Sequence, residues 1–135
     1  MIGLEELDKT PAVLVAEDNT ISARLMMCLI QKFTGTAPCF AANGQEAYEK
    51  VVNGNYDLVF MDHQMPICSG DEAVQLIRSD ESIENQPFIV GLSASAEGEM
   101  ENFENCGLDM FITKPIPPAK LEHIMDLVTE RSLAA

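Results

Sequence analysis

Short apolar runs alternate with helical patterns along most of this chain, and this alternation constrains the fold more than any other feature. We predict strands at residues 12–16 (AVLVA), 39–42, 57–61 (DLVFM), 88–92 and 110–113. The central runs are apolar at almost every position, as a parallel sheet that is buried on both faces requires. Five such runs separated by helices indicate an α/β protein built on a parallel sheet.

Five segments show the three-to-four spacing of apolar residues that predicts helices. The first can be capped by Asn19 or Thr20, and its apolar positions are Met26, Leu29, Ile30 and Phe33. The others are expected at residues 45–52 after Asn43, around Ala73, Val74 and Ile77, at residues 97–106 before Gly107, and from about Pro118 onward.

Length and composition indicate one domain, residues 1–135, with a core from about residue 12 to residue 130. No apolar run approaches the ~20 residues that a membrane span needs. The acidic Glu5 and Glu6 and the lack of a basic start argue against a signal peptide. We therefore expect a cytoplasmic location, and no output domain after the last helix.

The charge of the chain bears on its partners. The formal net charge is −14, with 22 acidic and 8 basic residues. Such a surface repels nucleic acids and is compatible with cations or with a basic or apolar protein face. The cysteines (Cys28, Cys39, Cys68 and Cys106) form no C-x-x-C pair. We expect reduced thiols in or near the core and no zinc site.

The predicted strands end in residues that can carry chemistry. Glu17 and Asp18 follow the first strand, Asp62 the third and Ser93 the fourth, while Lys114 ends the fifth. The carboxyl ends of parallel strands meet at one edge of the sheet, where ligands bind in open α/β folds. Each residue alone would be ordinary, a helix-start acid, a turn residue or a surface lysine, but their convergence predicts a site.

Three clustered carboxylates need either a proton or a cation between them. Oxygen ligands without histidine or thiol favour Mg²⁺, with Mn²⁺ as an alternative. Asp62 is the expected nucleophile for a phosphoryl group, because a carboxylate can form an aspartyl phosphate. Lys114 would stabilise the transferring group opposite the cation, and the Ser93 hydroxyl could donate to it.

Four segments together resemble the response regulator receiver domains of two-component signalling: VLVAEDN, DLVFMDHQMP, GLSAS and FITKPI. The resemblance runs from about Ala12 to Val128, with all segments in order. It implies a doubly wound (βα)₅, flavodoxin-like three-layer sandwich whose five-stranded parallel sheet has the order 2-1-3-4-5. The segments EDN, NGQEA and MDHQMP are most like the receivers of hybrid sensor histidine kinases.

The resemblance also implies a role for each site residue. Asp62 would be the phosphoacceptor, and Asp18 and the backbone carbonyl of Gln64 would bind the cation, with Glu17 acting mainly through water. Ser93 would be the switch hydroxyl and Lys114 the phosphate-contacting lysine. The aromatic switch position would be Phe111, and the Lys114–Pro115 peptide would be cis.

The sequence departs from the commonest receiver pattern at four positions, and none removes an essential group. Glu17 occupies a position where aspartate is usual, and Ser93 one where threonine is usual. Phe111 lacks the hydroxyl that tyrosine would have there. Ser69 stands where aspartate or asparagine often precedes the glycine, so the loop after Asp62 is expected to differ.

We therefore expect a phosphorelay module rather than an enzyme, with at most slow self-dephosphorylation. A histidine kinase or histidine phosphotransfer domain would dock near the first helix, and phosphorylation would change the face formed by the fourth helix, the fifth strand and the last helix. One alternative is a Mg²⁺-dependent phosphatase with an aspartyl-phosphate intermediate, although Gln64 occupies the position of its usual second carboxylate. Another is an unphosphorylated pseudo-receiver that only binds partners.

Overall fold

The computed structural model describes residues 11–94 and 106–134, with side chains as far as residue 130. The strands are β1 (Val13–Ala16), β2 (Cys39–Ala41), β3 (Leu58–Asp62), β4 (Phe88–Ser93) and β5 (Met110–Thr113). The helices are α2 (Thr20–Thr34), α3 (Gly44–Asn53), α4 (Gly70–Ser79) and α6 (Pro118–Ala134). The helix expected at residues 97–106 lies almost wholly outside the described residues.

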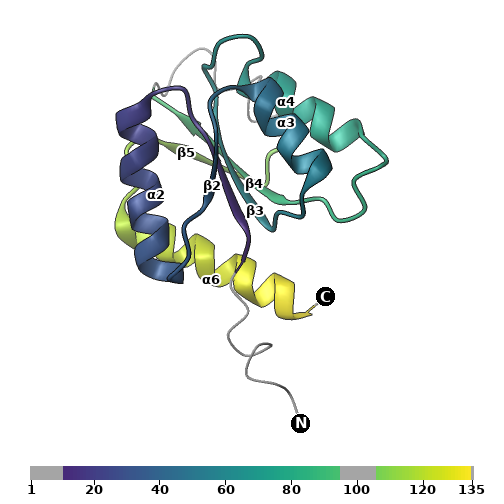
Figure 1. Ribbon diagram of the computed structural model, residues 1–135. Helices are drawn as coiled ribbons and strands as arrows, with labels where there is room; N and C mark the ends of the chain where they lie inside the picture. The colour runs from purple at the N-terminus through teal and green to yellow at the C-terminus, as the bar shows by residue number, and fades with distance from the viewer. Residues whose placement is uncertain (1–10, 95–105, 135) are drawn as a thin grey trace.

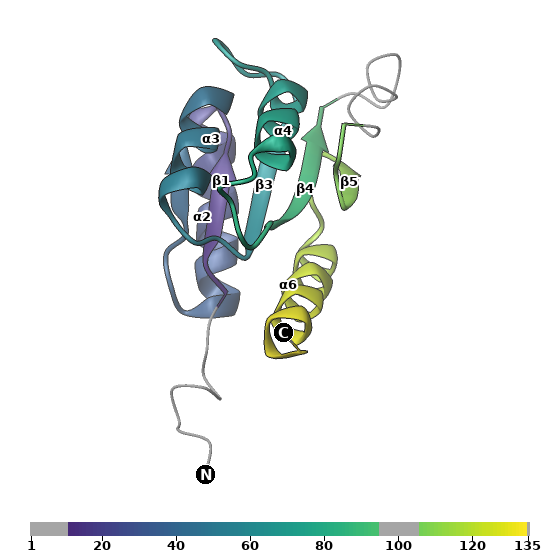
Figure 2. The same ribbon diagram turned by 90° about the vertical axis from the view of Figure 1, so that its right-hand side faces the viewer.

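The five strands form one parallel sheet in the order β2-β1-β3-β4-β5, which confirms the predicted doubly wound topology. Helices α2 and α6 cover one face of this sheet, and α3 and α4 cover the other (Figures 1 and 2). The chain crosses from β1 to β2 and then returns past β1 to β3, and this reversal creates a switch point between β1 and β3. Ligands of such sheets bind at this point, outside the carboxyl ends of the strands.

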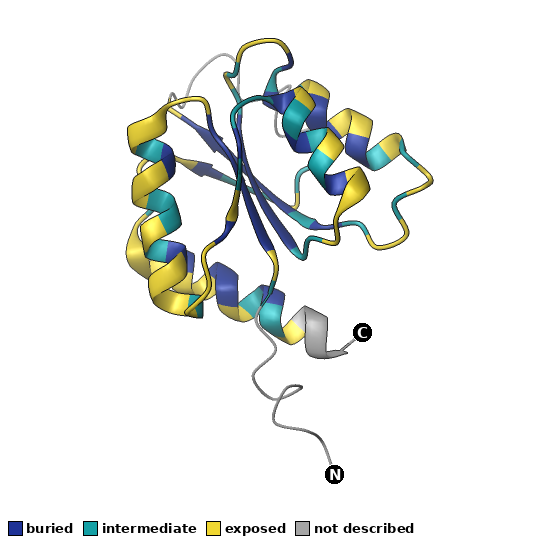
Figure 3. Cartoon of the chain, viewed as in Figure 1, coloured by how far each residue is buried: buried dark blue, intermediate teal, exposed yellow. Residues whose placement is uncertain are grey.

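Alternate residues of the central strands supply two separate cores. Leu58 and Phe60 of β3 pack toward α2 and α6, whereas Val59 and Met61 pack toward α3 and α4. All four side chains are fully buried, and burial of each large apolar side chain contributes about 1.5–3 kcal/mol. The central strands are buried along most of their length (Figure 3), so packing on both faces holds their carboxyl ends in place.

Two strands extend into polar residues that the apolar pattern excluded. Strand β3 ends at Asp62, which pairs with Leu92, and β4 ends at Ser93, which pairs with Thr113. Backbone pairing continues there because the N–H of His63 also donates to the carbonyl of Leu92, at 2.9 Å. These two candidate site residues are thus carried by the strands themselves and not by the loops after them.

Two smaller expectations were wrong, and one open alternative is decided. Phe33 is 41% exposed, because it lies near the end of α2, beyond the region that the sheet covers. Cys28 and Cys39 are exposed rather than in the core, since Cys28 lies on the outer side of α2 and β2 is an edge strand. Of the two capping candidates, Asn19 is the cap: its side chain accepts a hydrogen bond from the Ser22 N–H at 3.0 Å.

None of the helices in the part of the chain that the structure describes has the length and apolar character that crossing a membrane requires.

Candidate functional site

Three carboxylates meet at the switch point of the sheet. Glu17 and Asp18 follow β1 and Asp62 ends β3, and each offers an oxygen that lies within 4.8 Å of the others. Glu17 and Asp62 are buried, with 2% and 5% of their surface exposed, whereas Asp18 is exposed. The cluster predicted from the strand ends is therefore present, with one carboxylate open to solvent.

Lys114 joins this cluster from the end of β5. Its Nζ lies 2.7 Å from Glu17 Oε1 and 2.9 Å from Asp62 Oδ1. The peptide between Lys114 and Pro115 is cis, as predicted, and the Lys114 N–H donates to the Ser93 carbonyl at 2.8 Å. Burial lowers the pKa of Lys114, but its hydrogen bonds to the two carboxylates outweigh that effect and raise the pKa above its ordinary value.

Glu17 is the most perturbed member of the cluster. Burial, together with the hydrogen bond to Asp62, raises its pKa to about 7, although Lys114 acts in the opposite direction. Its Oε2 atom is buried and has no hydrogen-bond partner. A carboxylate oxygen left in this way fits a divalent cation or a cation-bound water, because oxygen ligands of this charge are those that Mg²⁺ takes in proteins.

The remaining predicted residues surround the cluster. Ser93 is buried at the end of β4, one strand away from Asp62. Phe111 is half-buried in the middle of β5, where it pairs with Gly91. Gln64 is exposed in the loop after β3 and lines an open hollow of about 540 Å³ together with Asp18.

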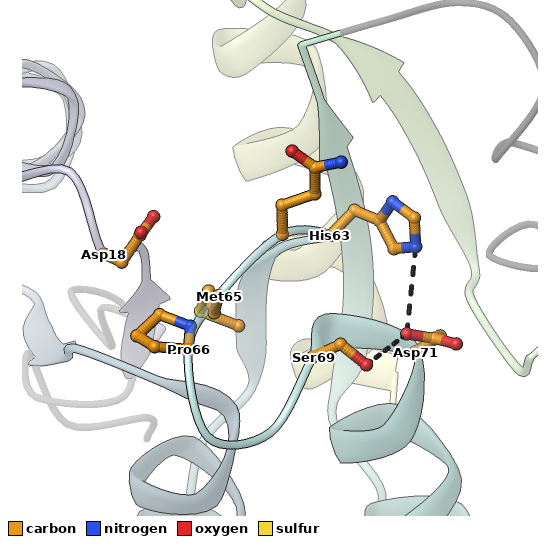
Figure 4. Close-up of a pocket in the computed structure, with 7 residues that line it drawn as sticks. Asp18, His63, Met65, Pro66, Ser69 and Asp71 are labelled. Carbon is orange, nitrogen blue, oxygen red and sulfur yellow. Dashed lines mark hydrogen bonds and ion pairs between the residues drawn. The ribbon is translucent and has the colours of Figure 1, made fainter.

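The same hollow contains a polar group that the sequence did not single out. His63 Nε2 lies 3.8 Å from Asp71 Oδ1, and this oxygen also accepts a hydrogen bond from Ser69 Oγ at 2.5 Å (Figure 4). These residues come from the β3–α4 loop and the first turn of α4, facing Asp18 across the hollow (Figure 4). The position of His63 directly after Asp62, at the end of a strand, was the one sequence feature that could have pointed to this contact.

Gly70 explains how the loop after β3 returns so closely to the site. A Cβ atom at this position would collide with the backbone carbonyl of Asp62, and the Gly70 N–H donates to the His63 carbonyl at 2.8 Å. Only glycine allows helix α4 to begin against the carbonyl of the candidate acceptor.

A second hollow, of about 270 Å³, lies between α2 and the chain that joins β5 to α6. Its apolar lining comes from Leu25, Met26 and Leu29 of α2 and from Pro115 and Ile116. Glu17 and Lys114 of the charged cluster also line it. An apolar surface is thus continuous with the charged site.

Comparisons with known proteins identify relatives across most of the chain. The family model "Response regulator receiver domain" matches residues 13–126. Hybrid signal transduction histidine kinases G and F of Dictyostelium discoideum are 35% and 36% identical over 116 and 122 residues, which are 84% and 87% of this chain. These matches cover only 3% and 11% of the two kinases. The polar-differentiation response regulator DivK of Brucella ovis is 30% identical over 107 residues, which are 79% of this chain and 86% of DivK.

Solved structures show the same architecture. The receiver domain of the sensor histidine kinase PA1611 from Pseudomonas aeruginosa, with a magnesium ion in its active-site cleft, aligns with a TM-score of 0.81. It is 25% identical, and the match covers 90% of this chain and 98% of that one. The receiver domain of Ssk1 from Saccharomyces cerevisiae, in complex with the histidine phosphotransfer protein Ypd1, aligns with a TM-score of 0.81 and 28% identity, over 92% of each chain.

Proposed function

From the premise that this chain belongs to the response regulator receiver domain family of two-component signalling, we propose that Asp62 accepts one phosphoryl group in a Mg²⁺-dependent reaction. The observation that carries the proposal is the environment of Asp62, a buried carboxylate 2.9 Å from Lys114 Nζ and within 4.8 Å of two further carboxylates. We also propose that residues 1–135 are one receiver domain, with its core at about residues 12–130.

In the proposed reaction Asp62 is the nucleophile and Lys114 supplies positive charge. A carboxylate oxygen of Asp62 bonds to phosphorus while the bond from phosphorus to a donor histidine nitrogen breaks, so one phosphoryl group moves and no oxidation occurs. Lys114 stabilises the negative charge on the phosphoryl oxygens, since its Nζ already lies beside Asp62. The product is an aspartyl phosphate, and the leaving imidazole keeps its electron pair.

The residues that would hold Mg²⁺ are Asp18, Asp62 and the backbone carbonyl of Gln64, with Glu17 acting through water. The orphaned Oε2 of Glu17 and the open side of the cluster at Asp18 support this assignment. When bound, the ion would neutralise the carboxylates and polarise the phosphoryl oxygens. Magnesium in the cleft of the similar PA1611 receiver supports Mg²⁺, and Mn²⁺ has similar ligand preferences.

Helix α2 offers the docking surface for a phosphodonor. Ile21 and Leu25, one turn apart on α2, are 72% and 64% exposed, and Leu25 also lines the apolar hollow. Helix α2 has no acidic residue, although it carries Arg24 and Lys32 and the whole chain has a net charge of −14. This surface suits a phosphohistidine-bearing domain with an apolar centre and an acidic rim, and the complex of Ypd1 with a similar receiver supports that class of partner.

Phosphorylation would change the conformation at β5. Ser93 is the hydroxyl that would donate to the new phosphate, and Phe111, half-buried on the neighbouring strand, would occupy the space that Ser93 leaves. Phosphorylation then biases an equilibrium between two arrangements of this edge strand and the helices beside it.

Incubation with acetyl phosphate tests the proposal. The parent chain should gain the mass of one phosphoryl group in the presence of Mg²⁺ and none with a chelator. Asp18→Ala should weaken both this labelling and Mg²⁺ binding by about tenfold or more, because even outer-shell partners of a metal contribute about 10- to 100-fold. Many rapid turnovers of phosphate per chain would identify a phosphatase and contradict the acceptor role, as would full labelling without a metal.

A further inference from the structure

Ile67 has a backbone conformation that isoleucine rarely adopts. Its φ is 70°, and among the described residues it is the one non-glycine position with positive φ. A β-branched side chain is strained there, because Cβ approaches the following carbonyl oxygen. The Ile67 side chain is also 84% exposed, so packing within the chain does not explain its presence.

A tight turn holds Ile67 in this conformation. The Cys68 N–H donates to the Pro66 carbonyl at 2.7 Å, which makes Ile67 the central residue of a three-residue turn. With positive φ at its centre, this is the rarer and more strained kind of γ-turn. The turn therefore presents the side chain of Ile67 to solvent at one defined place.

Hydrogen bonds on both sides fix the turn to the body of the protein. Cys68 is buried, and its carbonyl accepts a hydrogen bond at 3.0 Å from the N–H of Gly44 at the start of α3. The N–H of Gly70 closes the loop by donating to the His63 carbonyl at 2.8 Å. Backbone strain of this kind persists only where the surrounding structure enforces it, and it is typical of binding and switching segments.

The position of the turn relates it to the acceptor site. It belongs to the loop that begins directly after Asp62, and its neighbours Met65 and Pro66 line the hollow beside Asp18. The same edge of the sheet carries the start of α2, with its exposed Ile21 (Figure 1). A protein that brings a histidine to Asp62 must therefore pass both the α2 surface and the β3–α4 loop.

We propose that Ile67 is a specificity-determining contact for the phosphodonor protein, on the side of Asp62 away from α2. This inference rests on the proposed function, because it assigns the residue to the same encounter. The occupant is a histidine phosphotransfer domain, since the turn is continuous with the acceptor loop and a similar receiver domain, that of Ssk1, forms a complex with the histidine phosphotransfer protein Ypd1. Glycine or asparagine would adopt the positive φ of this turn with less strain, yet this chain has an exposed apolar side chain there.

The test compares two phosphodonors on the same variants. Ile67→Asn and Ile67→Gly keep a residue that tolerates positive φ and remove the apolar side chain, so both should raise the melting temperature. Phosphotransfer from histidine-phosphorylated Ypd1 should slow by about tenfold, as for loss of one apolar anchor from an interface. Labelling by acetyl phosphate with Mg²⁺ should keep the parent rate, and Ile67→Leu should restore transfer from Ypd1. Leu76→Asn, at a half-exposed apolar position of α4, is the matched control and should leave both rates unchanged.

Each other outcome contradicts a different claim. Parent-like transfer from Ypd1 to Ile67→Asn would overturn the inference, and so would equal slowing with both donors, which would place the effect in the chemistry. A parent that takes phosphate from acetyl phosphate but not from Ypd1 would refute the histidine phosphotransfer domain as the occupant. A parent that takes phosphate from neither donor would refute the proposed function itself.

Discussion

The side chain of Lys114 lies between two carboxylates that are almost fully buried. Its distances of 2.7 Å to Glu17 and 2.9 Å to Asp62 make it a counter-ion that the two carboxylates share. The sequence indicated that Lys114 and the acids would share one edge of the sheet. It could not indicate this pairing, because the contact depends on side-chain conformations of residues that are 97 positions apart.

Removing this counter-ion should destabilise the metal-free protein. Lys114→Ala leaves Glu17 and Asp62 without their cation, and we expect the free energy of unfolding to fall by about 2–3 kcal/mol. This is less than the roughly 3–5 kcal/mol of a fully buried pair, because Lys114 retains contact with water. Urea unfolding monitored by circular dichroism measures the change. Mg²⁺ should recover part of the loss, because it supplies positive charge to the same carboxylates.

Lys120→Ala is the matched control, since it removes an exposed lysine of α6 and the same formal charge. Its unfolding free energy should stay within about 0.5 kcal/mol of the parent. Equal effects of the two substitutions would mean that Lys114 acts only through net charge.

At the scale of elements, Arg78 joins the end of α4 to two distant segments. Its guanidinium donates to the carbonyls of Pro87 and Gly107 at 2.9 Å each, and to Asp109 Oδ2 at 2.7 Å. Asp109 Oδ2 in turn accepts the N–H of Ile89 at 2.8 Å. One side chain thus connects α4 with the segments before β4 and before β5. This contact lies at the amino ends of the strands, opposite to the cluster of Glu17, Asp18 and Asp62.

A lysine cannot replace the several hydrogen-bond donors that the planar guanidinium of Arg78 holds in fixed directions. Arg78→Lys keeps the charge but offers one ammonium in place of several fixed donors, so we expect the unfolding free energy to fall by about 1–2 kcal/mol. Chemical denaturation measures the effect, with Arg24→Lys on the exposed side of α2 as the control. An unchanged midpoint for Arg78→Lys would show that charge alone holds these segments together.

Apolar runs predicted the strands because a two-sided parallel sheet buries every residue of its central strands. They failed at the strand ends, where Asp62 and Ser93 continue the backbone pairing despite their polar side chains. Helical spacing placed Ile30 correctly in the core but not Phe33, because periodicity does not report where a helix extends beyond its sheet. Elements could thus be predicted, while their ends depend on tertiary contacts.

At the scale of the whole molecule, strand order determines the site. Parallel strands bring Glu17, Asp18, Asp62, Ser93 and Lys114 to one edge, so the residue set followed from the positions of the strand ends. The His63–Asp71 contact and the positive φ of Ile67 could not be predicted, since loop conformation follows from close approaches such as that of Gly70 to the Asp62 carbonyl.

The central claim is that Asp62, and neither of its two carboxylate neighbours, takes the phosphoryl group. The most direct measurement is phosphorylation with acetyl phosphate and Mg²⁺, followed by borohydride reduction, which converts an acyl phosphate into an alcohol, and by peptide mass spectrometry. We expect the reduced residue at position 62 alone and no labelling of Asp62→Asn. A reduced residue at Glu17 or Asp18 in the parent, or full labelling of Asp62→Asn, would contradict the account.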